Sequence, residues 1–216
     1  MTLRIVVGNK NYSSWSLRPW LALRQTGEAF EEQVISLYDP SSRAELARLS
    51  PSGRVPVLYD GSLCVWESLA ICEYLAERFP SSRLWPDDQK ARAMARSVSH
   101  EMHAGFTALR THLPMGVRRR LPCHDDSPAL AAEIARVQSL WQTCRVQYGA
   151  GGEFLFGRFS IADAMYAPVA FRFQTYNVSL DAGARRYCDT LLSMPAMQEW
   201  AQAAAAEPWS LPQFEK

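Results

Sequence analysis

The chain has 216 residues, of which 48% are hydrophobic and 21% are charged. These are the proportions of an ordinary globular protein, so they exclude a disordered chain and a fibrous repeat. The 23 basic and 22 acidic residues give a formal net charge of +1, which leaves no overall positive field to attract nucleic acid or an anionic membrane. No apolar run is long enough to cross a bilayer.

The first third of the sequence begins with the pattern of a βαβ unit. Residues 3–7 form a short β-branched run typical of a buried strand. Apolar residues at helical spacing over 17–23 predict a helix with Pro19 in its first turns, where a missing N–H is tolerated. A second strand is predicted at 32–37. The polar stretch 39–48 that follows is either a short helix or irregular.

A hairpin and another helix come next. Asp60-Gly61 is a favoured hairpin turn between the strands predicted at 57–59 and 63–66. Pro56 opens the first of these strands, where its missing donor does least harm. Apolar residues at steps of three and four follow Glu67 and predict a helix with one face in a core. The order βαβ then ββα predicts an α/β thioredoxin-like domain over residues 1–80.

The remainder of the chain is predicted to be an all-α helical domain. The stretch 80–88 contains two prolines, serines and acids. We interpret residues 81–88 as a linker, followed by a domain over 89–216. Ser160 and Asp163 have the spacing of a capping box, which starts a helix and carries no chemistry. The predicted helices span 88–113, 127–148, 160–175, 181–192 and 195–206.

The cysteine pattern indicates a reducing compartment. The five cysteines are odd in number and form no CxxC pair. The opening residues, from Met1 to Arg4, lack the apolar region of a signal peptide. We therefore expect free, buried thiols and a cytoplasmic protein.

Three motifs make the whole chain resemble the cytosolic glutathione S-transferases. Residues 12–23 contain Ser-Ser-Trp-Ser followed by an arginine-bearing helix, and are most similar to the serine-type opening of the zeta class. Residues 50–56 resemble the family's loop before a cis-proline. Residues 67–71 resemble its γ-glutamyl-binding turn. The resemblance implies a glutathione S-transferase fold, glutathione as co-substrate, no metal, and a homodimer.

By this resemblance a serine hydroxyl stabilises the glutathione thiolate. Only a few per cent of a free thiol, with its pKa of about 8.5, is ionised at neutral pH. We assign the donor to Ser13, with Ser14 as the alternative; a simple helix N-cap is the structural interpretation of either residue. Trp15 stands where the zeta and beta classes carry a cysteine, which excludes mixed-disulfide chemistry there and weighs against zeta-type isomerase activity.

The same resemblance assigns the rest of the glutathione site. Val55, beside a cis Pro56, presents its main chain to the cysteine of the peptide. Glu67 and Ser68 open a helix whose N–H groups favour the γ-glutamyl carboxylate, and Glu67 takes the ammonium group. Candidates for the contact with the glycine end are Ser41, Ser42, Arg43 and Arg54, of which Arg54 is preferred because it lies beside Val55.

The second substrate is expected against the first helices of the helical domain. The candidates for contacts with the electrophile or with a partner subunit are Trp15, His103, Arg110 and Met115. His103 and Arg110 could bind an anionic electrophile or, from a partner subunit, a carboxylate of glutathione. Trp209 and Phe214 in the tail either cap this pocket or pack the end of the chain. The run His-Glu-Met-His at 100–103 lacks the i, i+4 spacing of the helical zinc motif, so no metal site is predicted.

These features predict a glutathione transferase that conjugates small apolar electrophiles. Two alternatives stay open. One is a glutathione-dependent cis-trans isomerase resembling maleylacetoacetate isomerase. The other is a non-catalytic glutathione-fold module that binds a partner, since a fold does not fix its function.

Overall fold

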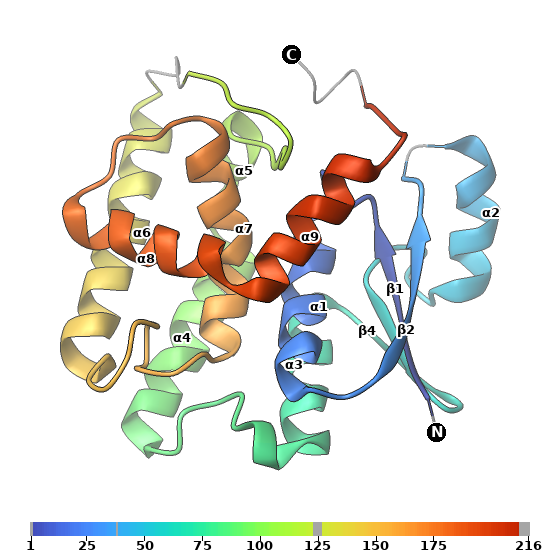
Figure 1. Ribbon diagram of the computed structural model, residues 1–216, viewed down its shortest axis with the longest axis horizontal. Helices are drawn as coiled ribbons and strands as arrows, with labels where there is room; N and C mark the ends of the chain where they lie inside the picture. Colours follow the sequence, from blue (N-terminus) through green and yellow to red (C-terminus); the bar gives the residue numbers. More distant parts are fainter. Residues whose placement is uncertain (1, 38, 123–126, 212–216) are drawn as a thin grey trace.

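A computed structural model describes residues 2–37, 39–122 and 127–211. A four-stranded sheet and its helices make up the N-terminal part, and a bundle of helices the remainder (Figure 1). The elements in chain order are β1 (Leu3–Gly8), α1 (Ser14–Thr26), β2 (Phe30–Ile35), α2 (Pro40–Leu49), β3 (Val57–Asp60), β4 (Leu63–Trp66) and α3 (Ser68–Arg78). After a 3-10 turn (Pro80–Ser82) come α4 (Gln89–Ala104), α5 (Thr107–His112), α6 (Pro128–Tyr148), α7 (Ile161–Thr175), α8 (Ala182–Ser193) and α9 (Pro195–Ala206).

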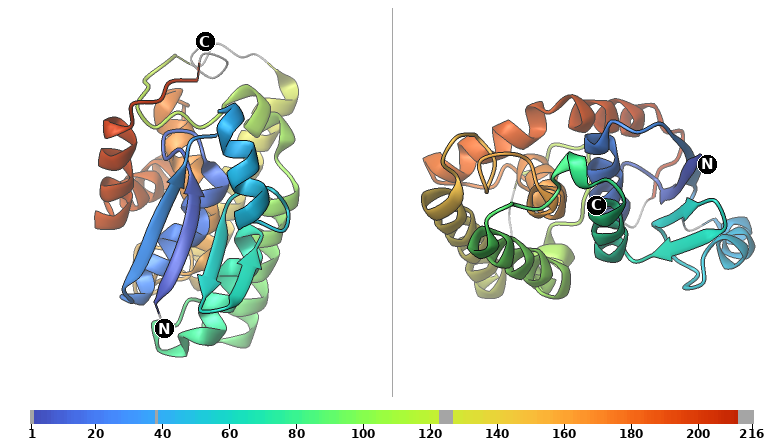
Figure 2. Two further views of the ribbon diagram at one scale, coloured as in Figure 1. Left: turned by 90° about the vertical axis from the view of Figure 1, so that its right-hand side faces the viewer. Right: turned by 90° about the horizontal axis from the view of Figure 1, so that it is seen from below.

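The sheet has the order β2-β1-β3-β4, with β1 parallel to β2 and antiparallel to β3. Alternate residues of β1 face opposite sides. Ile5 and Val7 join the main core, whereas Val6 packs with Ile35 and Val57 in a second cluster. The view from below in Figure 2 shows α2 on the outer face of the sheet, and α1 and α3 between the sheet and the helical bundle. This arrangement confirms the predicted thioredoxin-like fold class.

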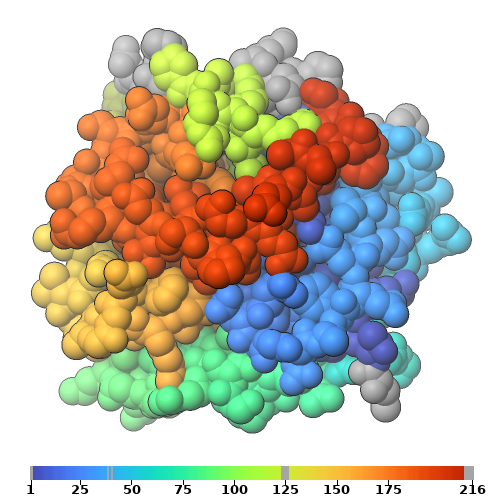
Figure 3. Space-filling view, viewed as in Figure 1, coloured from blue at the N-terminus to red at the C-terminus, as the bar shows by residue number. Residues whose placement is uncertain are grey.

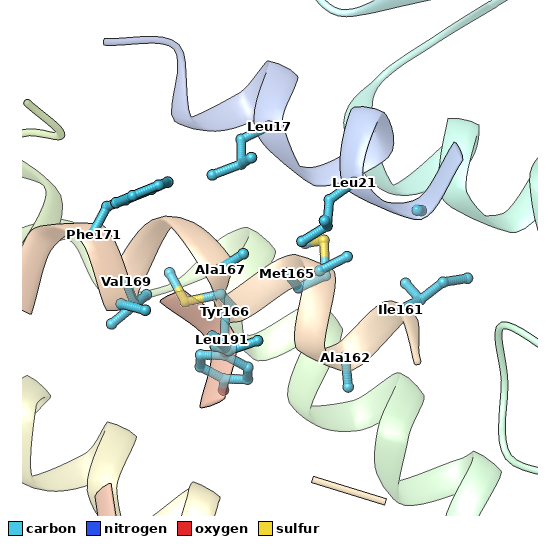
Figure 4. Close-up of a cluster of buried hydrophobic side chains, with 14 of the residues drawn as sticks. Leu17, Leu21, Ile161, Ala162, Met165, Tyr166, Ala167, Val169, Phe171 and Leu191 are labelled. Atoms are coloured by element: carbon cyan, nitrogen blue, oxygen red, sulfur yellow. The ribbon is translucent and has the colours of Figure 1, made fainter. Parts of the chain in front are cut away.

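The two halves of the chain share one hydrophobic core. Helix α1 packs along α7, and Leu17 and Leu21 are fully buried in the same cluster as Met165 (Figure 4). Burial of one such side chain contributes roughly 1.5–3 kcal/mol. The start of α1, where the serine motif lies, is therefore held against the helical domain.

The C-terminal segment secures the loop that precedes α1. Trp200 of α9 packs edge-on against Trp20, with ring centroids 5.0 Å apart, and its indole N–H donates to the Lys10 carbonyl at 2.8 Å. Beyond α9, the Glu207 carboxylate accepts from the main-chain N–H groups of Lys10 and Asn11. Figure 3 shows this red C-terminal segment lying against the blue N-terminal one. The loop leading into the serine motif is thus held at Lys10 and Asn11.

Two predicted elements differ from the structure. Strand β2 spans Phe30–Ile35 and not 32–37, because its pairing with β1 begins at Leu3 opposite Phe30. A shift of two residues leaves every side chain on its predicted face. The undecided stretch after Asp39 is helix α2, whose N-terminus is capped by the Asp39 carboxylate accepting from the Ser41 N–H at 2.9 Å.

The single helix predicted over 88–113 is wrong. The structure contains α4 and α5, separated at Gly105 and Phe106. Phe106 has a φ of 60°, a left-handed conformation that ends one helix and redirects the chain into the next. The helical spacing of buried apolar residues continues across this break, at Met102, Phe106 and Leu109. The sequence pattern therefore gave no sign of two separate helices.

The capping box at the start of α7 is confirmed. The Asp163 carboxylate accepts from the Ser160 N–H at 2.8 Å and from the Ser160 hydroxyl at 3.0 Å. It also accepts from the Leu155 N–H and the Tyr187 hydroxyl. Burial raises the pKa of Asp163, whereas these hydrogen bonds act to lower it.

Across the described ranges, no helix combines the length and hydrophobicity needed to cross a membrane.

Candidate functional site

The serine motif lies at the start of α1. Ser13 occupies the N-cap position, but its side chain makes no capping bond to the helix. Its hydroxyl instead donates to the Ser16 hydroxyl at 2.7 Å, and Ser16 accepts a further bond from the Gly8 N–H at 3.1 Å. The proton of Ser13 is therefore engaged within the motif.

Ser14 has a different partner. Its hydroxyl oxygen accepts from the Arg172 guanidinium of α7 at 3.1 Å, and the same arginine also donates to the Leu113 carbonyl. A serine hydroxyl has one proton and two acceptor lone pairs. Within the described residues the Ser14 hydroxyl donates no hydrogen bond, so its proton remains available to a ligand in the adjoining cavity.

Three arginines surround this serine with positive charge. Arg18 and Arg172 are buried, and Arg110 is partly buried. Burial and the neighbouring Arg110 and Arg172 lower the pKa of Arg18 to about 9; burial and Arg110 lower that of Arg172 to about 10. Both groups are charged at neutral pH. None of the three forms an ion pair with an Asp or Glu of the described chain.

Trp15 lies among these charges. The Arg18 and Arg110 guanidinium carbons lie 4.2 and 4.8 Å from its ring centroid, which are cation-π distances. The His103 ring meets it edge-on at 5.3 Å, and His103 Nε2 is 3.2 Å from a Glu67 carboxylate oxygen. Trp15 therefore points into the site, where its ring contacts Arg18, Arg110 and His103.

The loop before β3 presents an open main-chain edge. The Val55–Pro56 peptide is cis, which confirms the expectation taken from the resemblance. Val55 comes just before the ladder of β3, and neither its N–H nor its C=O is hydrogen-bonded to any residue the structure describes. An extended peptide can pair with such an edge as an added strand.

The start of α3 provides a second polar group without a partner. Glu67 has a φ of 76° and directs the chain into the helix. Ser68 is 1% exposed, and its buried hydroxyl oxygen has no hydrogen-bond partner. A hydroxyl and free N–H groups at a helix N-terminus favour a carboxylate. The orphaned hydroxyl fits an anionic ligand here.

Two cavities bring the predicted residues together. One, of about 420 Å³, is lined by Tyr12, Ser13, Ser14, Trp15, Leu37, Leu46, Gly53, Arg54, Val55, Arg110, Pro114, Met115 and Arg172. The other, of about 290 Å³, is lined by Trp15, Ser52, Arg54, Val55, Pro56, Glu67 and Ser68. They share Trp15, Arg54 and Val55. We call them the serine cavity and the Glu67 cavity. His103 lines neither but contacts Trp15 and Glu67.

None of the four described cysteines lines either cavity. Cys72, Cys144 and Cys188 are buried and free, Cys64 is partly buried and free, and Cys123 lies outside the described residues. Burial raises the pKa of Cys144 and of Cys188 to about 12, so both remain protonated at neutral pH. No described cysteine therefore supplies a thiolate beside Ser14.

The residues of the His-Glu-Met-His run serve other contacts. Glu101 forms an ion pair with Arg136 at 2.7 Å, and His103 faces Glu67. In the described ranges, no three His, Cys, Asp or Glu side chains are grouped to hold a metal ion. Of the tail residues, Trp209 is not among those lining the serine cavity; its carbonyl accepts from Arg118 at 2.8 Å. Phe214 lies outside the described residues.

The sequence interpretation missed Arg18 and Arg172 as parts of the site. A signal for Arg172 was present, because Asp163 and Arg172 are the charged residues of the otherwise apolar helix α7. A lone cation in a buried helix indicates a functional partner. Nothing in the local sequence indicates that this partner is Ser14.

Comparisons with known proteins agree with the geometry. Residues 12–78 match the model of the glutathione S-transferase N-terminal domain, and residues 100–203 match that of the C-terminal domain. The chain is 28% identical over 172 residues to glutathione S-transferase GstB of Escherichia coli K12, covering 76% of this chain and 75% of that protein. It is 28% identical over 174 residues to maleylacetoacetate isomerase of Rattus norvegicus, covering 77% and 76%.

A solved structure supports the fold. A glutathione transferase homologue from Burkholderia gl BGR1, crystallised with bound glutathione, superimposes with a TM-score of 0.73 at 22% identity, covering 96% of this chain and all of that one. At this identity the likeness concerns the fold alone. The two domain models, however, span most of the sequence in the family's order. The chain therefore belongs to the glutathione S-transferase family.

Proposed function

We propose that this protein binds reduced glutathione across its two cavities and transfers it to a small electrophile. One observation carries the proposal: a single cleft presents the unengaged Ser14 proton, the unpaired main chain of Val55 and the unpartnered Ser68 hydroxyl. These groups match, in order, a thiol, a peptide backbone and a carboxylate. A structural scaffold has no need of all three.

The thiol end belongs in the serine cavity. A donor aimed at sulfur favours the anion, and each unit of pKa lowering corresponds to about 1.4 kcal/mol. Arg172 already occupies an acceptor site of Ser14, whereas the Ser13 proton is bonded to Ser16. This difference supports Ser14 as the donor to the thiol, whereas the motif alone favours Ser13. Ser13 would instead hold the motif together through its bond to Ser16. Arg172 adds positive potential behind the hydroxyl.

The γ-glutamyl end belongs in the Glu67 cavity. The Ser68 hydroxyl and the N-terminus of α3 suit its carboxylate, and the Glu67 side chain suits its ammonium group. Arg54 lines both cavities, which supports its assignment to the carboxylate at the glycine end. Val55, which precedes the cis Pro56, lines both cavities, so its main chain suits the middle of the peptide.

Glutathione-dependent isomerisation is a second candidate. It is favoured by the similarity, over about three quarters of the chain, to a relative named as maleylacetoacetate isomerase. Trp15, in the place of the zeta-class cysteine, weighs against it. Measuring turnover of a conjugation substrate and of a cis-unsaturated diketo acid on one preparation distinguishes the two activities, because only the first consumes glutathione.

The assembly and location are proposed from the family resemblance. We propose a cytoplasmic homodimer, in which a thioredoxin-like domain over 1–80 and a helical domain over 89–216 are joined by a linker. Light scattering that gives twice the chain mass of 24.4 kDa supports the dimer. A single chain mass at micromolar protein contradicts it.

Calorimetric titration with reduced glutathione tests the proposed function. We expect saturable binding, and a loss of about tenfold in affinity for Ser68→Ala, since a hydrogen bond to a charged group contributes about 1.5–3 kcal/mol. Ser97→Ala removes an exposed hydroxyl of α4 that bonds within its own helix and is the matched control. A folded wild-type protein that binds no glutathione would overturn the proposal.

A further inference from the structure

The serine cavity has a strongly one-sided charge. Arg54, Arg110 and Arg172 line it, and none of the described residues that line it is acidic. Arg18 lies close behind, buried, with two guanidinium nitrogens that have no partner. The Glu67 cavity differs, because an acid and Arg54 both line it. Positive charge thus accumulates where the reaction partner of the thiol would enter.

Arg110 is fixed by main-chain contacts. Its Nη2 donates to the carbonyls of Met102 and His103 at the end of α4, and its guanidinium lies over the Trp15 ring. No other hydrogen bond or ion pair to Arg110 occurs among the residues described. The remaining N–H groups of its planar fork are free, and they belong to a residue that lines the cavity.

Glutathione leaves Arg110 without a charge partner. In the proposed arrangement the thiolate lies beside Ser14 and Arg172, and the glycine carboxylate beside Arg54. Burying a cation is costly unless an anion or acceptors compensate it. Arg110 has carbonyl acceptors and is attracted by Glu133, and Arg18 is attracted by Glu67, but neither arginine forms an ion pair with an acid of the described chain. An anion on the second substrate would give Arg110 such a partner.

We propose that the electrophile is a carboxylate, held at Arg110, with an apolar body against Leu37, Pro114 and Met115. This inference rests on the proposed function, and of the two expectations from the sequence, an apolar electrophile and an anionic one at Arg110, it favours the second. A guanidinium fork binds both oxygens of a carboxylate in one plane. The apolar residues of the same cavity suit the uncharged part of such a molecule.

A matched pair of chloronitroarenes tests the charge preference. In both 4-chloro-3-nitrobenzoate and 4-chloro-3-nitrobenzamide, the glutathione thiolate attacks the ring carbon that bears chlorine. A C–S bond forms, and chloride leaves with the bonding electron pair. The two probes differ in the charge of one planar substituent of similar size. Each kcat/KM is divided by the uncatalysed rate constant with glutathione, which removes the difference in intrinsic reactivity.

We expect the wild-type protein to favour the benzoate by tenfold or more in this corrected ratio. Arg110→Gln should lower the ratio by at least tenfold, and Arg110→Lys should retain part of the preference because it keeps the charge. Arg186→Gln removes an exposed cation of α8 and should leave the ratio unchanged. Circular dichroism and glutathione titration on every variant establish that each is folded and binds its first substrate.

The outcomes separate the two proposals. If glutathione binds and the benzamide is turned over equally well, the proposed function stands and the carboxylate site is overturned. If glutathione does not bind, the proposed function fails, and calorimetric binding of the two arenes alone still tests the site. Tighter binding of the benzoate that depends on Arg110 supports the carboxylate site, and equal binding of the two arenes refutes it.

Discussion

The guanidinium group of Arg172 donates a hydrogen bond of 3.1 Å to the hydroxyl oxygen of Ser14. The two residues are 158 positions apart in the chain, one at the start of α1 and the other near the end of α7. Both are buried, and the tight packing of α1 on α7 fixes the contact. The helical domain thereby determines how a hydroxyl of the thioredoxin-like domain is oriented.

The first prediction concerns the two serines. Ser14→Ala removes the hydroxyl whose proton is unengaged and should lower kcat/KM for glutathione conjugation by about ten- to a hundredfold. Ser13→Ala breaks a bond within the motif and should have a smaller effect. Steady-state kinetics with 4-chloro-3-nitrobenzamide measures both. A greater loss in Ser13→Ala than in Ser14→Ala would show that the motif-based assignment was right.

A second prediction concerns Arg172. Arg172→Met keeps much of the side-chain volume but removes both the charge and the donor to Ser14. The thiolate should then form at higher pH, so the midpoint of the kcat/KM pH profile should rise by about one unit. Arg172→Lys keeps the charge and should shift the midpoint less. An unchanged midpoint in Arg172→Met, with normal glutathione affinity, would show that Arg172 does not contribute to ionisation of the thiol.

The third prediction is a loss of stability at Asp163. Four donors bond to this buried carboxylate, and Asp163→Ala would leave them without an acceptor. The free energy of unfolding should fall by about 3 kcal/mol or more. Urea denaturation followed by circular dichroism measures it. Asp189→Ala, at an exposed position of α8, should stay within about 0.5 kcal/mol of wild type.

The fourth prediction is a pH effect through His103. Burial lowers the pKa of this imidazole in the folded state below its ordinary value of 6.5, with Glu67 opposing the shift and Arg18, Arg110 and His100 reinforcing it. As pH falls through 6.5, the unfolded chain therefore takes up the proton first. The unfolded state then binds more protons than the native state, and stability falls.

His103→Asn removes this group and should lessen the loss of stability on acidification. Thermal unfolding of both proteins at several pH values between neutrality and mild acid gives the comparison. His112→Asn, at an exposed site at the end of α5, is the control. Parallel pH dependence of wild type and His103→Asn would show that His103 does not contribute.

Local patterns predicted most of the thioredoxin-like domain. The Asp60-Gly61 turn and the short apolar runs on either side of it specify a hairpin from neighbouring positions alone. The break at Phe106 was missed, because both flanking helices bury apolar residues at one continuing spacing and a left-handed aromatic residue has no pattern of its own. The offset of β2 likewise depends on its pairing partner and not on its own residues.

Only the parts of the site that lie within short sequence motifs were predicted. Val55, Pro56, Glu67 and Ser68 lie in short conspicuous segments, and the structure brings them to one cavity. The charge of the serine cavity depends on Arg172, which arrives from a helix far along the chain. Such a contact is set by the packing of α1 on α7, and no local spacing encodes it. The contribution of Arg172 to this cavity was therefore not predicted.

The central claim is that this cleft binds glutathione and ionises its thiol. Ultraviolet absorbance of the thiolate, recorded against pH for glutathione bound to the wild-type protein, tests it most directly. We predict a bound thiol pKa at least one unit below the value of about 8.5 for a free thiol. A bound thiol that titrates at the free value, in a folded protein saturated with glutathione, would contradict the account.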